Sequence, residues 1–169
     1  MTDKKVKKEP TDIENYFIEA SYTRAHIIGR VVMLESMMDI FLSTHFCKTK
    51  SLQNEIMEII FGTLKISTDS KRDAMNAIMN KHHKEFLKNN KFFNTDVQNI
   101  IAQRNIFAHY PIFDFGKGLS LYKLDKTISF LKFRNSKEMV SYTKKDIEYW
   151  FKKITDNTKL LVDLIKTME

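Results

Sequence analysis

The chain has 169 residues but only two prolines, Pro10 and Pro111, so one hundred consecutive residues between them lack proline. It also has only four glycines. β-Sandwiches and β-barrels need many tight turns, and tight turns draw heavily on proline and glycine. A mainly helical chain is therefore predicted. Its length fits one domain of roughly 150 residues, and its 43% hydrophobic residues are enough for a sizeable core.

The spacing of apolar residues also predicts helices. Between residues 16 and 45 they recur at intervals of three and four, which is typical of one long central helix. Further helices are predicted over 51–62, 67–91, 95–110 and 143–168. Residues 113–142 hold short β-prone runs at 119–122, 127–133 and 139–142, which predict two or three strands. The predicted fold is all-α: an antiparallel bundle of four to five main helices with a small β-hairpin or meander before the C-terminal helix.

Three local signals predict where two of these helices begin and end. Thr95 to Gln98 and Thr143 to Asp146 have the spacing of capping boxes at helix starts. Pro111 should end the fourth helix near Tyr110, because the residue before a proline is pushed out of the helical conformation. We expect a single helical domain over 12–169, preceded by a disordered basic tail over 1–11, which carries four lysines.

Charge and cysteine content restrict the class of protein. Lys and Arg number 28 against 21 Asp and Glu, and the net charge of +7 favours anionic partners such as nucleic acid. Lysines scattered along a chain are, however, also typical of a solvated surface. Charged residues interrupt each apolar run, no secretory signal is recognised, and Cys47 has no partner for a disulfide, so a cytoplasmic protein without a membrane span is expected. The histidines show no metal-ligand spacing, and neither a metal nor a cofactor is predicted.

The segment from Gln103 to Pro111 carries the candidate chemistry. Arg104 is expected on the buried face of its helix, where a guanidinium needs a carboxylate, a ligand or an opening to solvent. Asn105 and His109 lie within an arc of about 140° from Arg104, so the three could converge if the last turn loosens before Pro111. Glu35, on the edge of the first helix, is the candidate partner of Arg104. Asp39 is the second choice and is expected to be solvated.

The spacing Arg-x4-His, with a polar residue directly after the arginine, resembles the signature of the HEPN superfamily of helical domains. Here it reads Arg104-Asn105-Ile106-Phe107-Ala108-His109. The order of elements over residues 16–168 is similar to that family, although the motif itself covers six positions. Many members are metal-independent endoribonucleases, found among toxins of toxin–antitoxin pairs, abortive-infection proteins and CRISPR-associated effectors. The resemblance therefore implies RNA as the substrate and an antitoxin protein as a partner.

The resemblance also implies roles for these residues. The 2′-hydroxyl of a ribose would attack its own 3′-phosphate, leaving a 2′,3′-cyclic phosphate. His109 would move a proton, Arg104 would hold the phosphate, Asn105 would orient His109 or bind an oxygen, and Tyr110 and Glu35 would support them. One histidine cannot easily serve both sides of phosphorus, so a homodimer with a composite active site is expected. The alternative is a non-catalytic helical dimer that binds a partner protein, a nucleotide or RNA.

Overall fold

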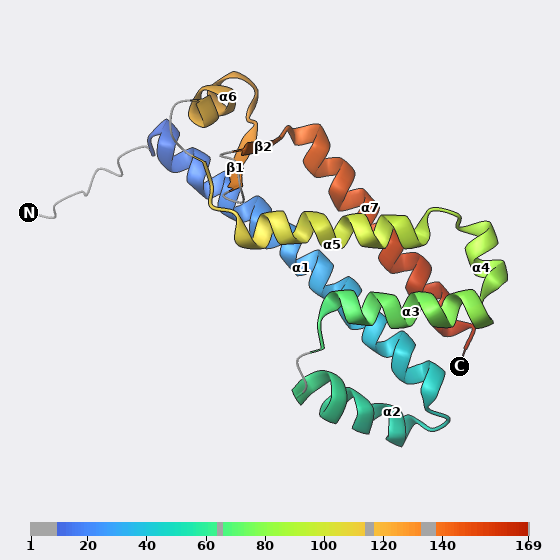
Figure 1. Ribbon diagram of the computed structural model, residues 1–169. Coiled ribbons are helices and arrows are strands. Elements are labelled where there is room, and N and C mark those ends of the chain that lie inside the picture. The colour runs from blue at the N-terminus through green and yellow to red at the C-terminus, as the bar shows by residue number, and fades with distance from the viewer. Residues whose placement is uncertain (1–9, 64–65, 114–116, 133–137, 169) are drawn as a thin grey trace, which may run out of the picture.

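The computed structural model describes residues 10–63, 66–113, 117–132 and 138–168. In these ranges it confirms the predicted all-α bundle with a small hairpin before the C-terminal helix (Figure 1). The helices are α1 (Asp12–Phe46), α2 (Lys50–Ile56), α3 (Thr68–His82), α4 (Lys84–Asn89), α5 (Phe93–His109), α6 (Lys117–Asp125) and α7 (Lys144–Lys166). A π-helical segment, η1 (Met57–Thr63), follows α2, and the antiparallel strands are β1 (Ile128–Lys132) and β2 (Glu138–Tyr142).

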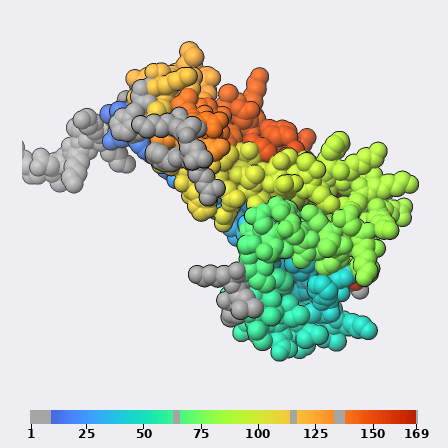
Figure 2. All heavy atoms as spheres, viewed as in Figure 1, coloured from blue at the N-terminus to red at the C-terminus, as the bar shows by residue number. Residues whose placement is uncertain are grey.

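The long helix α1 is the central element. At 35 residues it is about 52 Å long, and α3, α5 and α7 all pack against it. In Figure 2 the atoms of α3 and α5 cover most of α1 on the side shown. One face of α1 supplies a large share of the hydrophobic core, including the fully buried residues Ile27, Val31, Leu34, Met38 and Phe41. The described part of the chain contains no helix that is long and apolar enough to cross a membrane.

The starts of α7 and α5 test the two predicted capping boxes. The capping box at Thr143 and Asp146 is confirmed and begins α7. The one predicted at Thr95 is wrong: α5 begins at Phe93, and its N-cap residue Phe92 makes no side-chain cap hydrogen bond. Burial of Phe93 in the core fixes that start instead. Thr11, expected in the tail, caps α1 through Glu14, whereas the rest of the predicted tail, residues 1–9, lies outside the described residues.

The insertion before α7 is only partly as predicted. Its two strands pair in the register Ile128 with Tyr142 through Lys132 with Glu138. The first β-prone run, residues 119–122, is instead part of α6. Gly118 allows this, because a Cβ there would lie 2.3 Å from the carbonyl oxygen of Phe113. Tyr122 then packs against Tyr16 of α1, with ring centroids 5.0 Å apart, so tertiary packing overrides the local β preference.

The helix predicted over 67–91 is broken in two. His83 has φ −127° and ψ 43°, which ends α3 and begins α4 at the same residue. The ring of Phe86 on α4 then packs edge to face against the ring of Phe93 on α5, with centroids 5.2 Å apart. The break therefore lets the chain reverse direction before α5 and return across α1 (Figure 1).

Candidate functional site

The C-terminal half of α5 is anchored on the β-hairpin. Phe107 is fully buried, with its ring 4.9 Å from that of Phe130 and 4.8 Å from that of Tyr142. The hydroxyl of Tyr142 donates a hydrogen bond to Oε1 of Gln103 at 2.5 Å. The segment after Pro111 then runs beside β1, where the Ile112–Phe130 bridge forms. These contacts hold the motif segment on a rigid support.

Arg104 is half-buried on this helix and faces α1. Its Nε lies 4.0 Å from Oε1 of Glu35, and Nη1 donates to Oδ1 of Asn105 at 3.3 Å. Nε itself is buried and makes no hydrogen bond, so Glu35 holds the guanidinium by charge rather than by a close contact. Glu35 also accepts a hydrogen bond from Oγ1 of Thr68, at the start of α3, at 2.9 Å. The structure thus brings Arg104, Asn105 and Glu35 together.

Asp39 has a different role from the one expected. The prediction that it is solvated is wrong: it is buried and forms an ion pair with Lys71 of α3 at 2.8 Å. Burial raises the pKa of its carboxyl, and the hydrogen bond and charge of Lys71 act in the opposite direction. Glu35 and Asp39, one turn apart, therefore both connect α1 to α3, and only Glu35 also meets α5.

Asn105 and His109 lie on the exposed side of α5. The last turn does not loosen before Pro111, because the N–H of Tyr110 still donates to the carbonyl of Ile106 at 3.0 Å. Arg104 and His109 therefore remain about 140° apart around the helix and about 7.5 Å apart along it. Within the part of the chain that the structure describes, no hydrogen bond or ion pair joins His109 to Arg104 or Asn105. A group that touches both Arg104 and His109 must lie over Asn105, which is between them in angle.

Arg24 of α1 is a further contact to this segment that sequence reasoning missed. Its Nη2 donates to the carbonyl oxygen of Tyr110, and its guanidinium lies 5.3 Å from the centroid of the Phe130 ring. Burial lowers its pKa. Tyr110, named as a supporting residue, is half-buried and contributes this carbonyl at the helix end. An arginine between the buried residues Ala20 and Ile27 was the only signal in the sequence.

Three of the other histidines gather at the C-terminal end of α1. The ring centroid of His45 lies 5.0 Å from that of His82 and 6.3 Å from that of His83. Burial and neighbouring positive charge lower the pKa values of His45 and His83, which favours their neutral forms. His45 is half-buried. Among the described residues no group of three or more His, Cys, Asp or Glu side chains could hold a metal ion.

One face of α1 is exposed and carries no charge. We call it the α1 seam, and it consists of Ile18, Tyr22, Ala25, Gly29 and Val32. These residues recur at alternating intervals of four and three, which is the a/d spacing of a coiled coil. A Cβ added at Gly29 would meet nothing within 4 Å, so the centre of the seam is open. An apolar stripe of this kind on a surface helix is typical of a helix–helix contact.

The site combines three groups of α5, a half-buried guanidinium, an amide and an exposed imidazole. A carboxylate of α1, from Glu35, lies beside the guanidinium. Such a set can bind an oxyanion and move a proton. The HEPN resemblance depends on these same residues. Comparison of the chain with protein-family models, with curated proteins and with solved structures found no match.

Proposed function

We propose that the chain is a metal-independent endoribonuclease of the HEPN type. The observation that carries the proposal is the guanidinium of Arg104, set between Glu35 and Asn105 with part of its surface open, five residues before the exposed His109. A guanidinium held in this way presents donors in a fixed fork that matches the oxygens of a phosphodiester.

The reaction would use these groups as follows. The ribose 2′-oxygen forms a bond to phosphorus as the bond from phosphorus to the 5′-oxygen of the next nucleotide breaks. One imidazole takes the 2′-hydroxyl proton, and a second imidazole gives a proton to the leaving 5′-oxygen. Arg104 stabilises the charge that builds on the non-bridging oxygens. The phosphate lies over Asn105, where Arg104 and His109 can reach it from its two sides.

The second histidine would come from a second copy of the chain. The α1 seam supports this, because an apolar a/d stripe pairs well with itself about a two-fold axis. Arg24 and Glu35, two α1 residues that contact the motif segment, lie on the same edge of the seam. When two copies of α1 pair antiparallel about a two-fold axis, this edge of each helix lies on the same side of the pair. The two motifs would therefore border one cleft. This is the composite site that the chemistry needs.

The test is RNA cleavage by purified protein in EDTA. We expect wild-type protein to cut RNA and to leave 2′,3′-cyclic phosphate ends, detected by mass spectrometry. His109→Ala should lower the rate by about 10²- to 10⁴-fold and Arg104→Ala by about 10²-fold or more. His82→Ala is the matched control, since His82 is also exposed on a helix but lies in the other histidine group.

Three results would contradict the proposal. They are no cleavage of any RNA by the wild type, cleavage that EDTA abolishes, or equal activity in the His109→Ala and His82→Ala proteins. Absence of cleavage together with a stable dimer would favour the non-catalytic binding module. Growth arrest on expression, relieved by His109→Ala, would support a toxin or phage-defence role with an antitoxin partner.

A further inference from the structure

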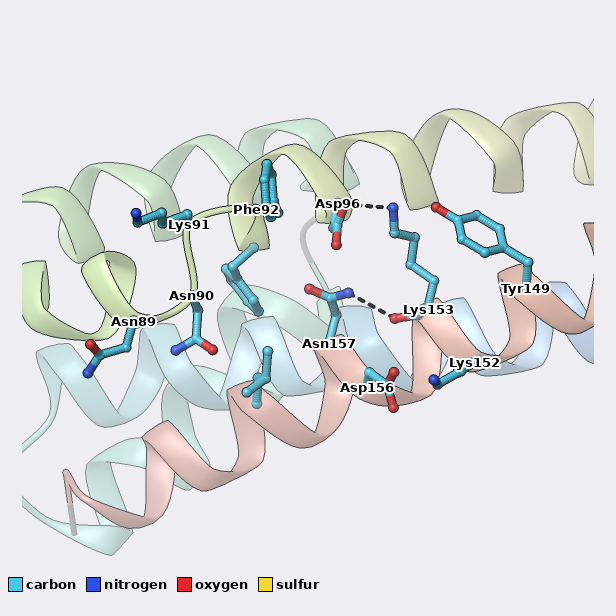
Figure 3. Close-up of a pocket in the computed structure, with 12 residues that line it drawn as sticks. Asn89, Asn90, Lys91, Phe92, Asp96, Tyr149, Lys152, Lys153, Asp156 and Asn157 are labelled. Atoms are coloured by element: carbon cyan, nitrogen blue, oxygen red, sulfur yellow. Dashed lines mark hydrogen bonds and ion pairs between the residues drawn. The ribbon is translucent and has the colours of Figure 1, made fainter.

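A cavity of about 400 Å³ lies at the other end of α5, between the turn that joins α4 to α5 and the middle of α7 (Figure 3). Its lining combines aromatic rings, amides, lysines and two aspartates. On α5, Asp96 is 8 residues from Arg104 and 13 from His109, so this cavity is about 12 Å from Arg104 and about 20 Å from His109 along the helix. It is a separate site from the one that cleavage would use.

The cavity has aromatic surface at its mouth. Phe92, the N-cap residue of α5, is 75% exposed, although the first residue of the helix, Phe93, is buried. Tyr149 of α7 is also exposed, and the two rings lie on either side of the ion pair between Asp96 and Lys153, which is 2.7 Å long (Figure 3). Exposed rings next to a cavity are suited to stacking on a flat ligand.

One hydrogen-bond acceptor among the buried side chains that line the cavity has no donor. Asn157 of α7 is only 4% exposed, and its Nδ2 donates to the carbonyl of Lys153 at 2.8 Å. Its Oδ1 makes no hydrogen bond and points toward the turn between α4 and α5 (Figure 3). A buried acceptor left without a partner costs about 1–3 kcal/mol, so a ligand N–H at this position would be favoured.

The start of α5 offers a place for an anion. This helix has 17 residues and no side-chain cap, and the N–H groups of Asn94 and Thr95 have no acceptor in the described segments. Free N–H groups at a helix start attract phosphate, and Lys91 and Lys152 add positive charge at the rim. Of the two lining aspartates, Asp96 is already neutralised by Lys153, and Asp156 is exposed.

We propose that this cavity binds a nucleotide. A nucleobase contacts Phe92 and Tyr149 and donates an N–H to Oδ1 of Asn157, while its phosphate lies at the start of α5 near Lys91. A free mononucleotide and one residue of a single-stranded RNA share this chemistry. The site does not depend on the ribonuclease proposal, because none of its residues belongs to the motif segment.

The test is calorimetric titration with AMP and with a 2′-O-methyl oligoadenylate of eight nucleotides, which this mechanism cannot cleave. Fluorescence of Trp150, the only tryptophan, is a second readout, since its ring centroid lies 5.3 Å from that of Tyr149. We expect binding of one or both probes and none of ribose 5-phosphate. Tighter binding of the oligomer assigns the site to an RNA strand, and equal binding assigns it to a free nucleotide.

Variants separate this site from folding and from the motif. Asn157→Leu should weaken binding at least tenfold and leave the melting temperature unchanged or higher, because it removes an unsatisfied buried oxygen. Phe92→Ala and Lys91→Gln should each weaken binding several-fold, whereas Lys145→Gln, an exposed lysine outside the cavity, should not. Arg104→Ala and His109→Ala should bind as wild type does. No binding at millimolar probe, or unchanged binding by a folded Asn157→Leu protein, would overturn the proposal.

Discussion

Replacing Glu35 by glutamine should separate the stability of the bundle from the activity of the motif. Glutamine keeps an oxygen for the Thr68 hydroxyl but removes the charge that faces Arg104. At 4.0 Å and an effective dielectric constant near 20, the gross attraction is about 4 kcal/mol. Because both side chains keep some exposure, the net contribution to folding is about 1 kcal/mol or less. The expected loss is about 2–4 °C in melting temperature.

The effect of this change on RNA cleavage should be larger than the stability loss suggests. Without the charge of Glu35, the Arg104 side chain keeps only the 3.3 Å hydrogen bond to Asn105 among the described residues. The guanidinium then spends less time in the orientation that meets the phosphate. We expect kcat/KM to fall by about 10-fold or more, which corresponds to about 1.4 kcal/mol of lost transition-state stabilisation.

Asp39→Asn is the matched control, one turn further along α1. It removes the charge that compensates the largely buried ammonium of Lys71, whose Nζ lies 2.8 Å from Oδ2 of Asp39, and this costs about 2–4 kcal/mol. The melting temperature should therefore fall by about 5–15 °C, with kcat/KM unchanged at a temperature where the protein stays folded. If Glu35→Gln lowered cleavage only in proportion to the unfolded fraction, or if Asp39→Asn lowered it as much, the role given to Glu35 would be refuted.

Three further changes test other parts of the structure. Ala25→Glu places a charge in the α1 seam and should convert a dimer to a monomer, measured by sedimentation at micromolar protein. Leu124→Glu, at an exposed position of α6, is the control and should leave the dimer intact. A wild-type protein that is only monomeric would contradict the composite site. Burial raises the pKa of Tyr142 to about 12 from 10.0, so between pH 10 and 12 the unfolded chain loses this proton while the folded chain keeps it, and stability falls. Tyr142→Phe should cost about 1 kcal/mol at neutral pH and show a smaller fall over that window in chemical denaturation. Gly118→Ala should lower stability by about 1–3 kcal/mol in thermal melts, because its Cβ would meet the Phe113 carbonyl; an unchanged melting temperature would contradict the packing described for α6.

Much of the fold could be predicted because its signals are local. The 3.6-residue period of α1 and the Thr143–Asp146 capping box of α7 are each contained in a few turns of chain. The end of α5 follows from Pro111 alone. These features need no knowledge of what packs against them, so sequence reasoning located them.

The features it missed depend on distant partners. The run 119–122 has β-prone residues, but Gly118 against Phe113 and Tyr122 against Tyr16 make it helical. The start of α5 was misplaced because burial of Phe93 outweighs the Thr95 capping pattern. In the same way, Arg24 could not be linked to the Tyr110 carbonyl, since 86 residues separate them in the chain.

The two proposed sites share α5, and this has a consequence for how RNA would lie. The nucleotide cavity is at the start of the helix, where unpaired N–H groups favour phosphate, and the motif is at its end. An α-helix is stiff, so the distance from the cavity along its axis is fixed, at about 12 Å to Arg104 and about 20 Å to His109. A strand held in the cavity would therefore meet Arg104 and His109 a constant number of nucleotides away. If the wild-type protein cuts RNA at a fixed distance from one end, and the Asn157→Leu protein cuts as much RNA without that preference, the two sites act on one strand. If the cuts are spread evenly in both proteins, the two sites act separately.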